Sequence, residues 1–311
     1  MKSKLLYLAP MEGVTDAIFR SSFQKFFGGI DKYYTPFLSP NATKRFTTKE
    51  LRFIDPKTND VAHTVPQLIT NNAGHFLWGL GEIAALGYKE INLNLGCPSG
   101  TVTAKKKGSG MLYYPEELDN FLYGIFEGKP SNVDVSVKTR LGKNDPEEFC
   151  RIFDIYSKYP ISELTIHPRI QKDYYREPVR PEYFDYAYNK NKTLSQPLKL
   201  VYNGDIGTPA EFDACFEKYP EIEAVMIGRA LVADPMMFTG FDRAKFKAFH
   251  DELFERYSEI LFGETQVVFR MKELWFYWSR NFENTDKPMK TIQKARSFSE
   301  YLWAVNEILA G

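Results

Sequence analysis

One cysteine stands where a thiol could take part in a reaction. Cys97 follows an apolar run and precedes Pro98 in NLNLGCPSGTVTAKKKGSG, residues 92–110, which continues into three lysines and a glycine-rich loop. A cysteine buried only for packing would need neither. Nucleophilic and proton-donating roles are both open here, because none of the four histidines has a spacing that marks it as a thiolate partner. Cys150 and Cys215 fall in helical patterns and are interpreted as core residues.

The elements that must position Cys97 are eight short apolar or β-branched runs, most of them followed by an amphipathic stretch. Parallel strands need crossover connections and helices to cover them, so this alternation predicts an α/β fold, a (β/α)₈ TIM barrel. A doubly wound sheet is the competing architecture, but no GxGxxG follows the first strand. The expected strands are 4–10, 32–37, 63–69, 90–96, 134–141, 163–169, 199–205 and 224–231, and the clearest helices are 15–27, 73–87, 115–128, 146–159 and 208–219, where Thr208 would be the N-cap.

Polar residues cluster at the ends of these otherwise apolar strands, which is where a barrel places its chemistry. Lys138 is the one strand lysine expected to point into the mouth, where it needs either a barrel carboxylate or an electron-rich ligand such as the N1 and O2 edge of a reduced flavin. The turns after the last two strands, NGD and GR, have the character of a phosphate site. One bound cofactor would explain the set, whose members are Gln67, Lys138, His167, Asn203 and Arg229.

After about residue 240 the strand pattern stops and apolar residues follow helical spacing. We therefore expect two domains, a catalytic barrel over 1–240 and a helical domain over 241–311. The stretch 268–296 has seven basic residues against three acidic ones, a bias that suits either nucleic-acid binding or an ordinary solvated helix face. The basic residues are Arg270, Lys272, Arg280, Lys287, Lys290, Lys294 and Arg296.

Composition narrows the class of protein. The 311 residues carry 40 basic and 40 acidic side chains, so any nucleic-acid partner must be met by a local patch. Three scattered cysteines exclude a disulfide framework and a zinc motif, and no apolar run is long enough for a signal peptide or a membrane span. We expect a cytoplasmic monomer with no metal and no membrane partner.

Six motifs, in order, resemble the tRNA-dihydrouridine synthases, flavin-dependent enzymes that reduce uridines in tRNA. The resemblance spans nearly the whole chain, and the GCPS element combined with PMEGVTD is its most specific part. The motifs are LAPMEGVTDAIFR, NLNLGCPSGTVTAKKKGSG, VSVKTRLG, TIHPR, VYNGDIG and MIGRAL.

The resemblance implies a role for each matching residue. Cys97 would be the general acid that protonates uracil C5. Lys105–Lys107 would lie on or near mobile loops over the RNA, and the motifs lean toward a D-loop uridine. The cofactor would be FMN, with NADPH or NADH as reductant and tRNA as partner. Cofactor contacts would come from Pro10, Met11, Glu12, Gln67, Lys138, His167, Asn203, Gly204, Asp205, Gly228 and Arg229, and substrate contacts from Asn94, Arg140, Tyr175 and Arg176.

Two other classes share part of this pattern. A flavin barrel acting on a small molecule, similar to a dihydroorotate dehydrogenase or an ene-reductase, would have the same phosphate turns without a basic helical domain. A non-catalytic RNA-binding protein could retain a degenerate barrel, but the set of strand-end residues here is intact.

Overall fold

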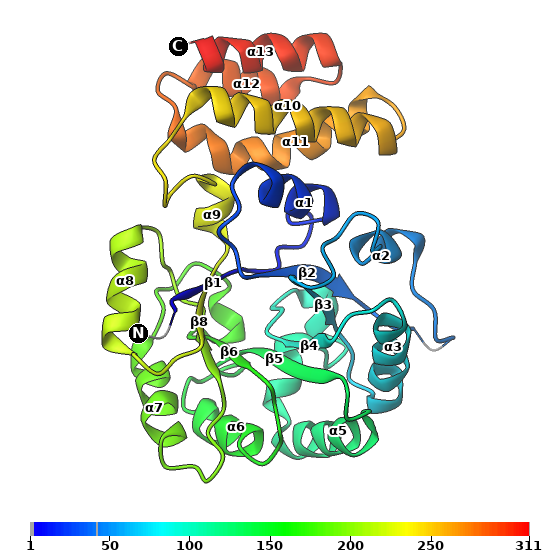
Figure 1. Ribbon diagram of the computed structural model, residues 1–311, viewed down its shortest axis with the longest axis vertical. Helices are drawn as coiled ribbons and strands as arrows, with labels where there is room; N and C mark the ends of the chain where they lie inside the picture. The colour runs from blue at the N-terminus through cyan, green and yellow to red at the C-terminus, as the bar shows by residue number, and fades with distance from the viewer. Residues whose placement is uncertain (1–2, 42, 311) are drawn as a thin grey trace.

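Eight parallel strands form a closed barrel in the computed structural model, which describes residues 3–41 and 43–310. Neighbours in the barrel are neighbours in sequence, and Leu5 of the first strand pairs with Ala224 of the last to close the ring. The TIM barrel and all eight strands are thus confirmed (Figure 1). The strands are β1 (Leu5–Leu8), β2 (Lys32–Leu38), β3 (Thr64–Leu68), β4 (Glu90–Leu95), β5 (Asp134–Arg140), β6 (Leu164–His167), β7 (Leu200–Tyr202) and β8 (Ala224–Ile227).

The strands are buried on both faces, which is why their sequences read as continuous apolar runs. Residues at alternate positions, such as Tyr7 and Ala9, fill the barrel interior, while the others pack under the surrounding helices. At the amino-terminal end, Lys32 pairs with Glu90 and Glu163, each at 2.6 Å. This ion cluster occupies that end, so the open end is the one where the strands finish.

Helices cover the outside of the barrel, as the alternation predicted. Thr208 caps α8 by accepting a hydrogen bond from the Glu211 amide at 3.2 Å. Four helices of the barrel region, α2, α4, α7 and α9, were not among those expected. The helices of the barrel region are α1 (Ala17–Phe26), α2 (Thr48–Phe53), α3 (Ala73–Ala85), α4 (Gly100–Thr103), α5 (Pro115–Gly128), α6 (Glu148–Tyr156), α7 (Pro181–Asn191), α8 (Pro209–Lys218) and α9 (Arg229–Ala233), with 3₁₀ turns η1 (Gly108–Tyr113) and η2 (Gln171–Asp173).

The last strand was predicted too long. The expected run 224–231 ends at Ile227, and Arg229 already begins helix α9. Gly228 separates the two elements with a backbone conformation that belongs to neither. Arg229 therefore sits at the first turn of a short helix beside the mouth.

Four helices follow the barrel and pack against α1 and α9 (Figure 1). They are α10 (Arg243–Ile260), α11 (Glu264–Trp278), α12 (Asp286–Lys294) and α13 (Phe298–Ala310), with the 3₁₀ turn η3 (Ser279–Asn281) between α11 and α12. Phe249 of α10 packs edge-on against Phe19, and the Trp278 indole donates to the Val232 carbonyl at 3.0 Å. The division into domains at residue 240 stays a prediction, since these helices share an extensive interface with the barrel.

Two of the basic residues counted in this region, Arg270 and Lys272, make contacts within the chain, and nucleic-acid binding by the region stays a prediction. The Arg270 guanidinium is largely buried and donates to the Asp16 carboxylate and the Val14 carbonyl, each at 2.8 Å. The Lys272 ammonium donates to the Gln293 carbonyl at the end of α12. Charge counting along a sequence cannot separate such internal contacts from an exposed patch.

Candidate active site

A cavity of about 750 Å³ opens at the carboxyl ends of the strands. The end of every strand contributes residues to its wall, and so do the last turn of α11 and the 3₁₀ turn η3 that follows it. Of the site residues expected from the sequence, all but Arg176 line it. Arg176 is exposed on the segment after β6, so its contact with RNA stays a prediction.

Cys97 is held at this mouth by its backbone. Its amide donates to Asn94 Oδ1 at 2.8 Å, and its carbonyl accepts from the Ser109 amide at 3.1 Å and the Ser109 hydroxyl at 2.8 Å. Burial raises the pKa of the thiol. The thiol therefore stays protonated at neutral pH, which suits a proton donor and not a thiolate nucleophile.

The glycine-rich segment after Cys97 packs beneath the thiol. Gly108 has φ +56°, and a Cβ there would lie 2.7 Å from the Cys97 carbonyl oxygen. Residues 108–112 are buried in the 3₁₀ turn η1, and the expected position of Lys105–Lys107 over the RNA stays a prediction. Lys106 pairs with Glu117 at 2.7 Å and Lys107 donates to the Ser39 hydroxyl at 3.1 Å. The segment's glycines permit close packing, which the sequence alone did not distinguish from flexibility.

Side-chain amides at neighbouring strand ends form one hydrogen-bonded chain. Asn92 donates to the Ser136 hydroxyl at 2.9 Å, and Gln67 donates to Asn92 at 2.8 Å. Asn94 in turn donates to Gln67 at 2.7 Å, while its own oxygen accepts from the Gly96 and Cys97 amides. This chain orients the Asn94 amide and through it Cys97. Among the described residues, the second N–H of the Asn94 amide and that of the Gln67 amide have no acceptor and could serve a ligand.

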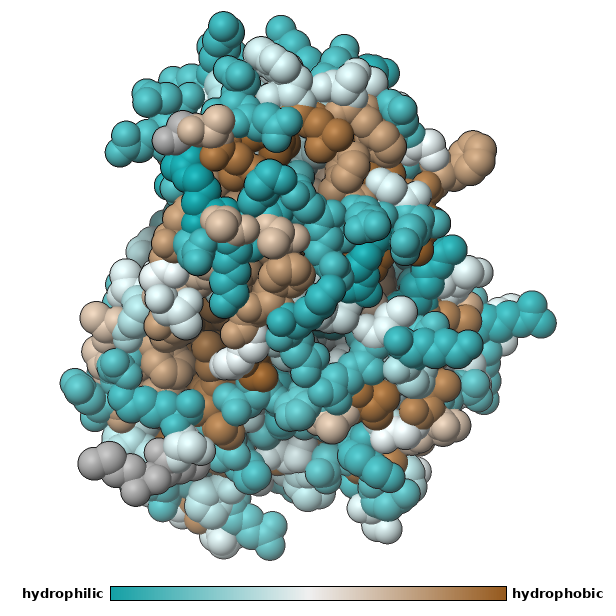
Figure 2. Space-filling view, turned by 45° about the horizontal axis from the view of Figure 1, so that its top comes forward, coloured by the Kyte–Doolittle hydropathy of each residue, from teal (hydrophilic) through white to brown (hydrophobic). Residues whose placement is uncertain are grey.

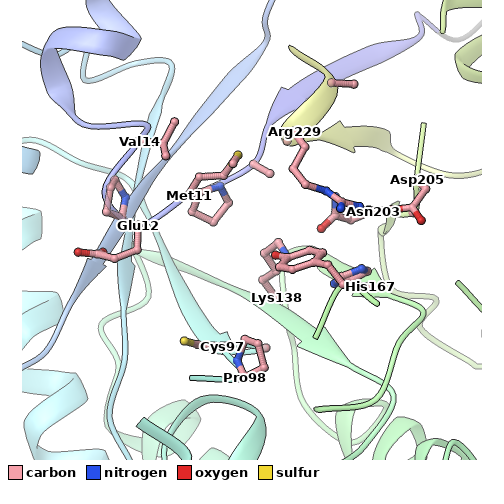
Figure 3. A pocket seen from close by; sticks show the side chains of 18 of the residues that line it. Met11, Glu12, Val14, Cys97, Pro98, Lys138, His167, Asn203, Asp205 and Arg229 are labelled. Atoms are coloured by element: carbon pink, nitrogen blue, oxygen red, sulfur yellow. Dashed lines mark hydrogen bonds and ion pairs between the residues drawn. The ribbon is translucent and has the colours of Figure 1, made fainter. Parts of the chain in front are cut away.

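Lys138 enters the cavity from β5, and in Figure 3 it lies between Cys97 on one side and Asn203 and Arg229 on the other. Its ammonium has no hydrogen bond or ion pair with any residue in 3–41 and 43–310, and the carboxylate partner considered above is not there. Burial, with a smaller effect of Arg140, lowers its pKa to about 7. An electron-rich ligand would restore the charge of this ammonium.

The opposite side of the cavity collects cations. Arg169 is buried and donates to Asp205 at 2.9 Å, and Arg229 donates to the same carboxylate at 2.7 Å. Burial acts to raise the Asp205 pKa, but the Arg169 and Arg229 contacts lower it overall. His167 lies among these groups, and burial together with four nearby cations holds its pKa well below its usual value. The guanidinium groups of Arg169 and Arg229 against the one Asp205 carboxylate leave a net positive site suited to an anion. Figure 3 shows Arg229 and Asp205 on this side.

Arg140 and Tyr175 form part of the rim. The Arg140 guanidinium donates to the Ile170 carbonyl at 2.9 Å and the Tyr174 carbonyl at 2.8 Å, which fixes the segment after β6 over the cavity. The exposed ring of Tyr175 then lies 4.5 Å from the Arg229 guanidinium. Asn203 is positioned similarly by a bond from its amide to the Met226 carbonyl at 2.7 Å. The predicted contacts of these side chains with substrate or cofactor stay predictions.

The end of α11 and the turn η3 bring to the cavity residues that were not among the site residues expected from the sequence, namely Phe276, Tyr277 and Arg280. Two exposed or half-exposed aromatics on a helix whose other face is fully apolar were the available signal, but nothing in the sequence placed that helix at the barrel mouth. Hydrophilic side chains predominate on the face seen in Figure 2, and hydrophobic ones gather among the C-terminal helices at its top.

Among the described residues there is no group of three or more His, Cys, Asp or Glu side chains arranged to hold a metal ion. None of the helices within 3–41 and 43–310 is both long and apolar enough to cross a bilayer.

A barrel whose open end gathers a thiol, an unpaired ammonium and an anion site belongs to the class of (β/α)₈ barrel enzymes. The family model described as dihydrouridine synthase (Dus) matches residues 7–307. A probable tRNA-dihydrouridine synthase of Staphylococcus aureus (strain COL) is 30% identical over 239 residues, covering 74% of this chain and 69% of the relative. The probable tRNA-dihydrouridine synthase 2 of Bacillus subtilis (strain 168) is 28% identical over 236 residues, covering 74% and 70%. The chain belongs to the dihydrouridine synthase family and is an oxidoreductase, so the resemblance read from its motifs is confirmed.

Solved structures agree on the fold. A 2-naphthoyl-CoA reductase complex superposes with a TM-score of 0.54 at 9% identity, covering 75% of this chain and 49% of that chain. Histamine dehydrogenase from Rhizobium sp. 4-9 superposes with a TM-score of 0.55 at 10% identity, covering 86% and 48%. This chain thus matches about half the length of each, and at such identities the likeness shows the barrel alone.

Proposed function

We propose that this protein is a tRNA-dihydrouridine synthase that reduces the C5=C6 bond of a D-loop uridine, with bound FMN and with NADPH or NADH as reductant. The observation that carries the proposal is a protonated, buried thiol sharing one cavity with an unpaired ammonium and an anion site. The family match and the names of the relatives supply the substrate class.

The residues of the cavity fit FMN. Lys138 has no hydrogen bond or ion pair within 3–41 and 43–310 and could face the electron-rich edge of the ring, and Gln67 lines the same cavity. Arg229 and Arg169 exceed the charge of Asp205, so the phosphate would go to that side, where His167 and Asn203 also lie. The remaining predicted contacts, Pro10 to Glu12 with Gly204 and Gly228, line the wall between. When bound, FMN would supply the hydride that C6 of uracil accepts.

The chain's own part in the reaction is to hold the base and deliver a proton. Negative charge that develops at C5 requires a proton, and the Cys97 thiol supplies it, which completes the addition of one hydride and one proton across the bond. The free N–H of Asn94 would donate to a uracil carbonyl, and Arg140 would support the rim above it. Donation leaves a thiolate, and because burial raises the pKa of this group, it regains a proton from solvent at neutral pH before the next turnover.

A uridine in folded tRNA must leave its stack to reach this cavity, with the backbone held outside. Three exposed lysines of α12, which we call the α12 lysines, are Lys287, Lys290 and Lys294. Their spacing places them along one side of the helix, where they make no ion pair with other described residues. Phosphate binding by these lysines supports the tRNA-binding role proposed for residues 241–311.

Two measurements test the proposal together. The purified protein is expected to be yellow with the spectrum of FMN, and tRNA from a strain lacking the gene should gain dihydrouridine at one D-loop position when incubated with protein and NADPH. A colourless protein that cannot be reconstituted with FMN would contradict the cofactor assignment. Reduction of a free pyrimidine but not tRNA would favour a barrel acting on small molecules.

A further inference from the structure

One face of α11 looks over the active-site cavity. Counted from Glu273, Phe276, Tyr277 and Arg280 stand at positions i+3, i+4 and i+7 and so lie on one side of the helical segment. The other side, which includes Leu274 and Trp278, is fully buried in the helical unit. A Cβ placed on Gly13 would lie 3.7 Å from the Glu273 carboxylate, so the face meets the turn after β1.

This face is aromatic where a solvent-facing helix would be polar. Phe276 is 68% exposed although it lines the cavity. Tyr277 is half-buried beside it, and burial and then the nearby Tyr175 raise its pKa. Tyr175, itself 54% exposed, comes from the segment after β6. Aromatic rings from two distant parts of the chain therefore meet at one mouth.

A positive charge accompanies these rings. The Arg280 guanidinium is exposed, lines the same cavity, and has no hydrogen bond or ion pair with the described part of the chain. Arg229 lies near enough to Tyr277 to act on its pKa. An exposed ring beside an unpaired guanidinium combines a surface for a base with a partner for a phosphate, the two elements of single-stranded nucleic-acid sites.

We propose that Phe276 stacks on the base of the nucleotide adjacent to the target uridine, and that Arg280 binds a phosphate of the same nucleotide. This inference rests on the proposed function. When the uridine enters the cavity, its neighbour loses a stacking partner and is held at the mouth by the covalent backbone. The Phe276 ring replaces that lost partner. Since every base has a π-face, the contact positions the strand and does not read its sequence.

The alternative occupant of the rim is the reductant, whose nicotinamide must also reach the cavity. The two differ in the half-reaction that a Phe276 variant impairs. Stacking on RNA affects only the oxidation of reduced protein by tRNA, whereas a reductant site affects only the reduction of the flavin by NADPH. Both rates can be followed separately on the holoenzyme by flavin absorbance.

The test uses Phe276→Ala holoenzyme, prereduced without oxygen and mixed with increasing concentrations of an unmodified tRNA transcript. The half-saturating tRNA concentration is expected to rise roughly tenfold to a hundredfold, as for loss of one base–aromatic stack. Phe276→Trp should restore it, and reduction by NADPH should be unchanged. The matched control is Phe262→Ala, since Phe262 is 99% exposed on the same helical unit but does not line the cavity.

A second measurement removes the other half of the contact. Two transcripts are compared, with an abasic site on the 5′ or on the 3′ side of the target uridine. One of the two should bind the wild type more weakly than the intact transcript, by the same factor as the Phe276→Ala substitution. That transcript should bind Phe276→Ala no more weakly than the intact transcript does. The stacking would be overturned if Phe276→Ala had the half-saturating tRNA concentration of the wild type, or if its reduction by NADPH were impaired. It would also be overturned if the losses from the substitution and from the abasic site multiplied. Failure of the wild type to form dihydrouridine in any tRNA would instead remove the proposed function, and this inference with it.

Discussion

Gly108→Ala is a sharp test of how Cys97 is positioned, because the added methyl group touches the residue that holds the thiol. The backbone at Gly108 has φ +56°, where an alanine costs about 1–2 kcal/mol. The new Cβ would also lie 2.7 Å from the Cys97 carbonyl oxygen, and ordinary contact begins at 3.4 Å, so the two must separate by about 0.7 Å. That movement strains both Ser109 hydrogen bonds to the carbonyl and displaces the thiol.

A displacement of this size is expected to slow oxidation of the reduced protein by tRNA roughly 30- to 100-fold, while reduction by NADPH is unchanged. Two controls separate the causes. Gly29→Ala has the same backbone cost at φ +70° with no atom within 4 Å, and Gly100→Ala has neither cost. Both should retain the wild-type rate of oxidation. If Gly108→Ala were as fast as Gly29→Ala, packing of η1 against the Cys97 carbonyl would not be what positions the thiol.

Three further predictions concern charge. The folded-state pKa of Lys138, about 7, lies below its unfolded value, so above pH 7 the unfolded chain binds more protons than the folded one. The free energy of unfolding of cofactor-free protein should therefore increase as pH rises, by at most about 1.4 kcal/mol per pH unit. Urea titrations should show a smaller increase in Lys138→Met. Arg270→Met should lower the free energy of unfolding by about 3 kcal/mol because it leaves Asp16 without its buried partner, and a loss below that of a surface arginine variant would argue against this interface contact. Reversing the charge of all three α12 lysines should weaken tRNA binding and leave reduction by NADPH unaffected. The slope of the logarithm of the binding constant against the logarithm of the salt concentration should fall in magnitude by roughly 3. An unchanged slope would mean that α12 does not contact RNA.

The barrel could be predicted from sequence because each strand is buried on both faces and each amphipathic helix follows it closely. The residues at strand ends could also be predicted, since a parallel barrel must bring them together. Cys97, Lys138 and Arg229 accordingly share one cavity, although they are far apart in the chain. These features depend on the local pattern of apolar residues and on the fact that a closed parallel barrel brings its strand ends together. Both can be inferred from a sequence.

The errors arose where a residue's role depends on packing between distant segments. Arg270 was counted as part of a basic surface, but α11 turns it inward against Asp16. Gly108 was interpreted only as part of a glycine-rich loop, although its missing side chain is what allows η1 to pack against Cys97. Phe276 was missed because only the docking of α11 on the barrel brings it to the mouth. Periodicity and charge counts contain no information about such contacts.

The most direct measurement of the proposed chemistry is a single turnover of Cys97→Ala against the wild type, each prereduced by NADPH and mixed with unmodified tRNA in the absence of oxygen. The Cys97 thiol shares its cavity with other groups that carry protons, among them Lys138, Tyr175 and Tyr277, so this variant tests whether the thiol is the donor. Wild-type protein should form about one dihydrouridine per flavin, whereas Cys97→Ala should be reduced at the normal rate and form almost none. Equal yields and rates of dihydrouridine from the two proteins would contradict proton donation by Cys97.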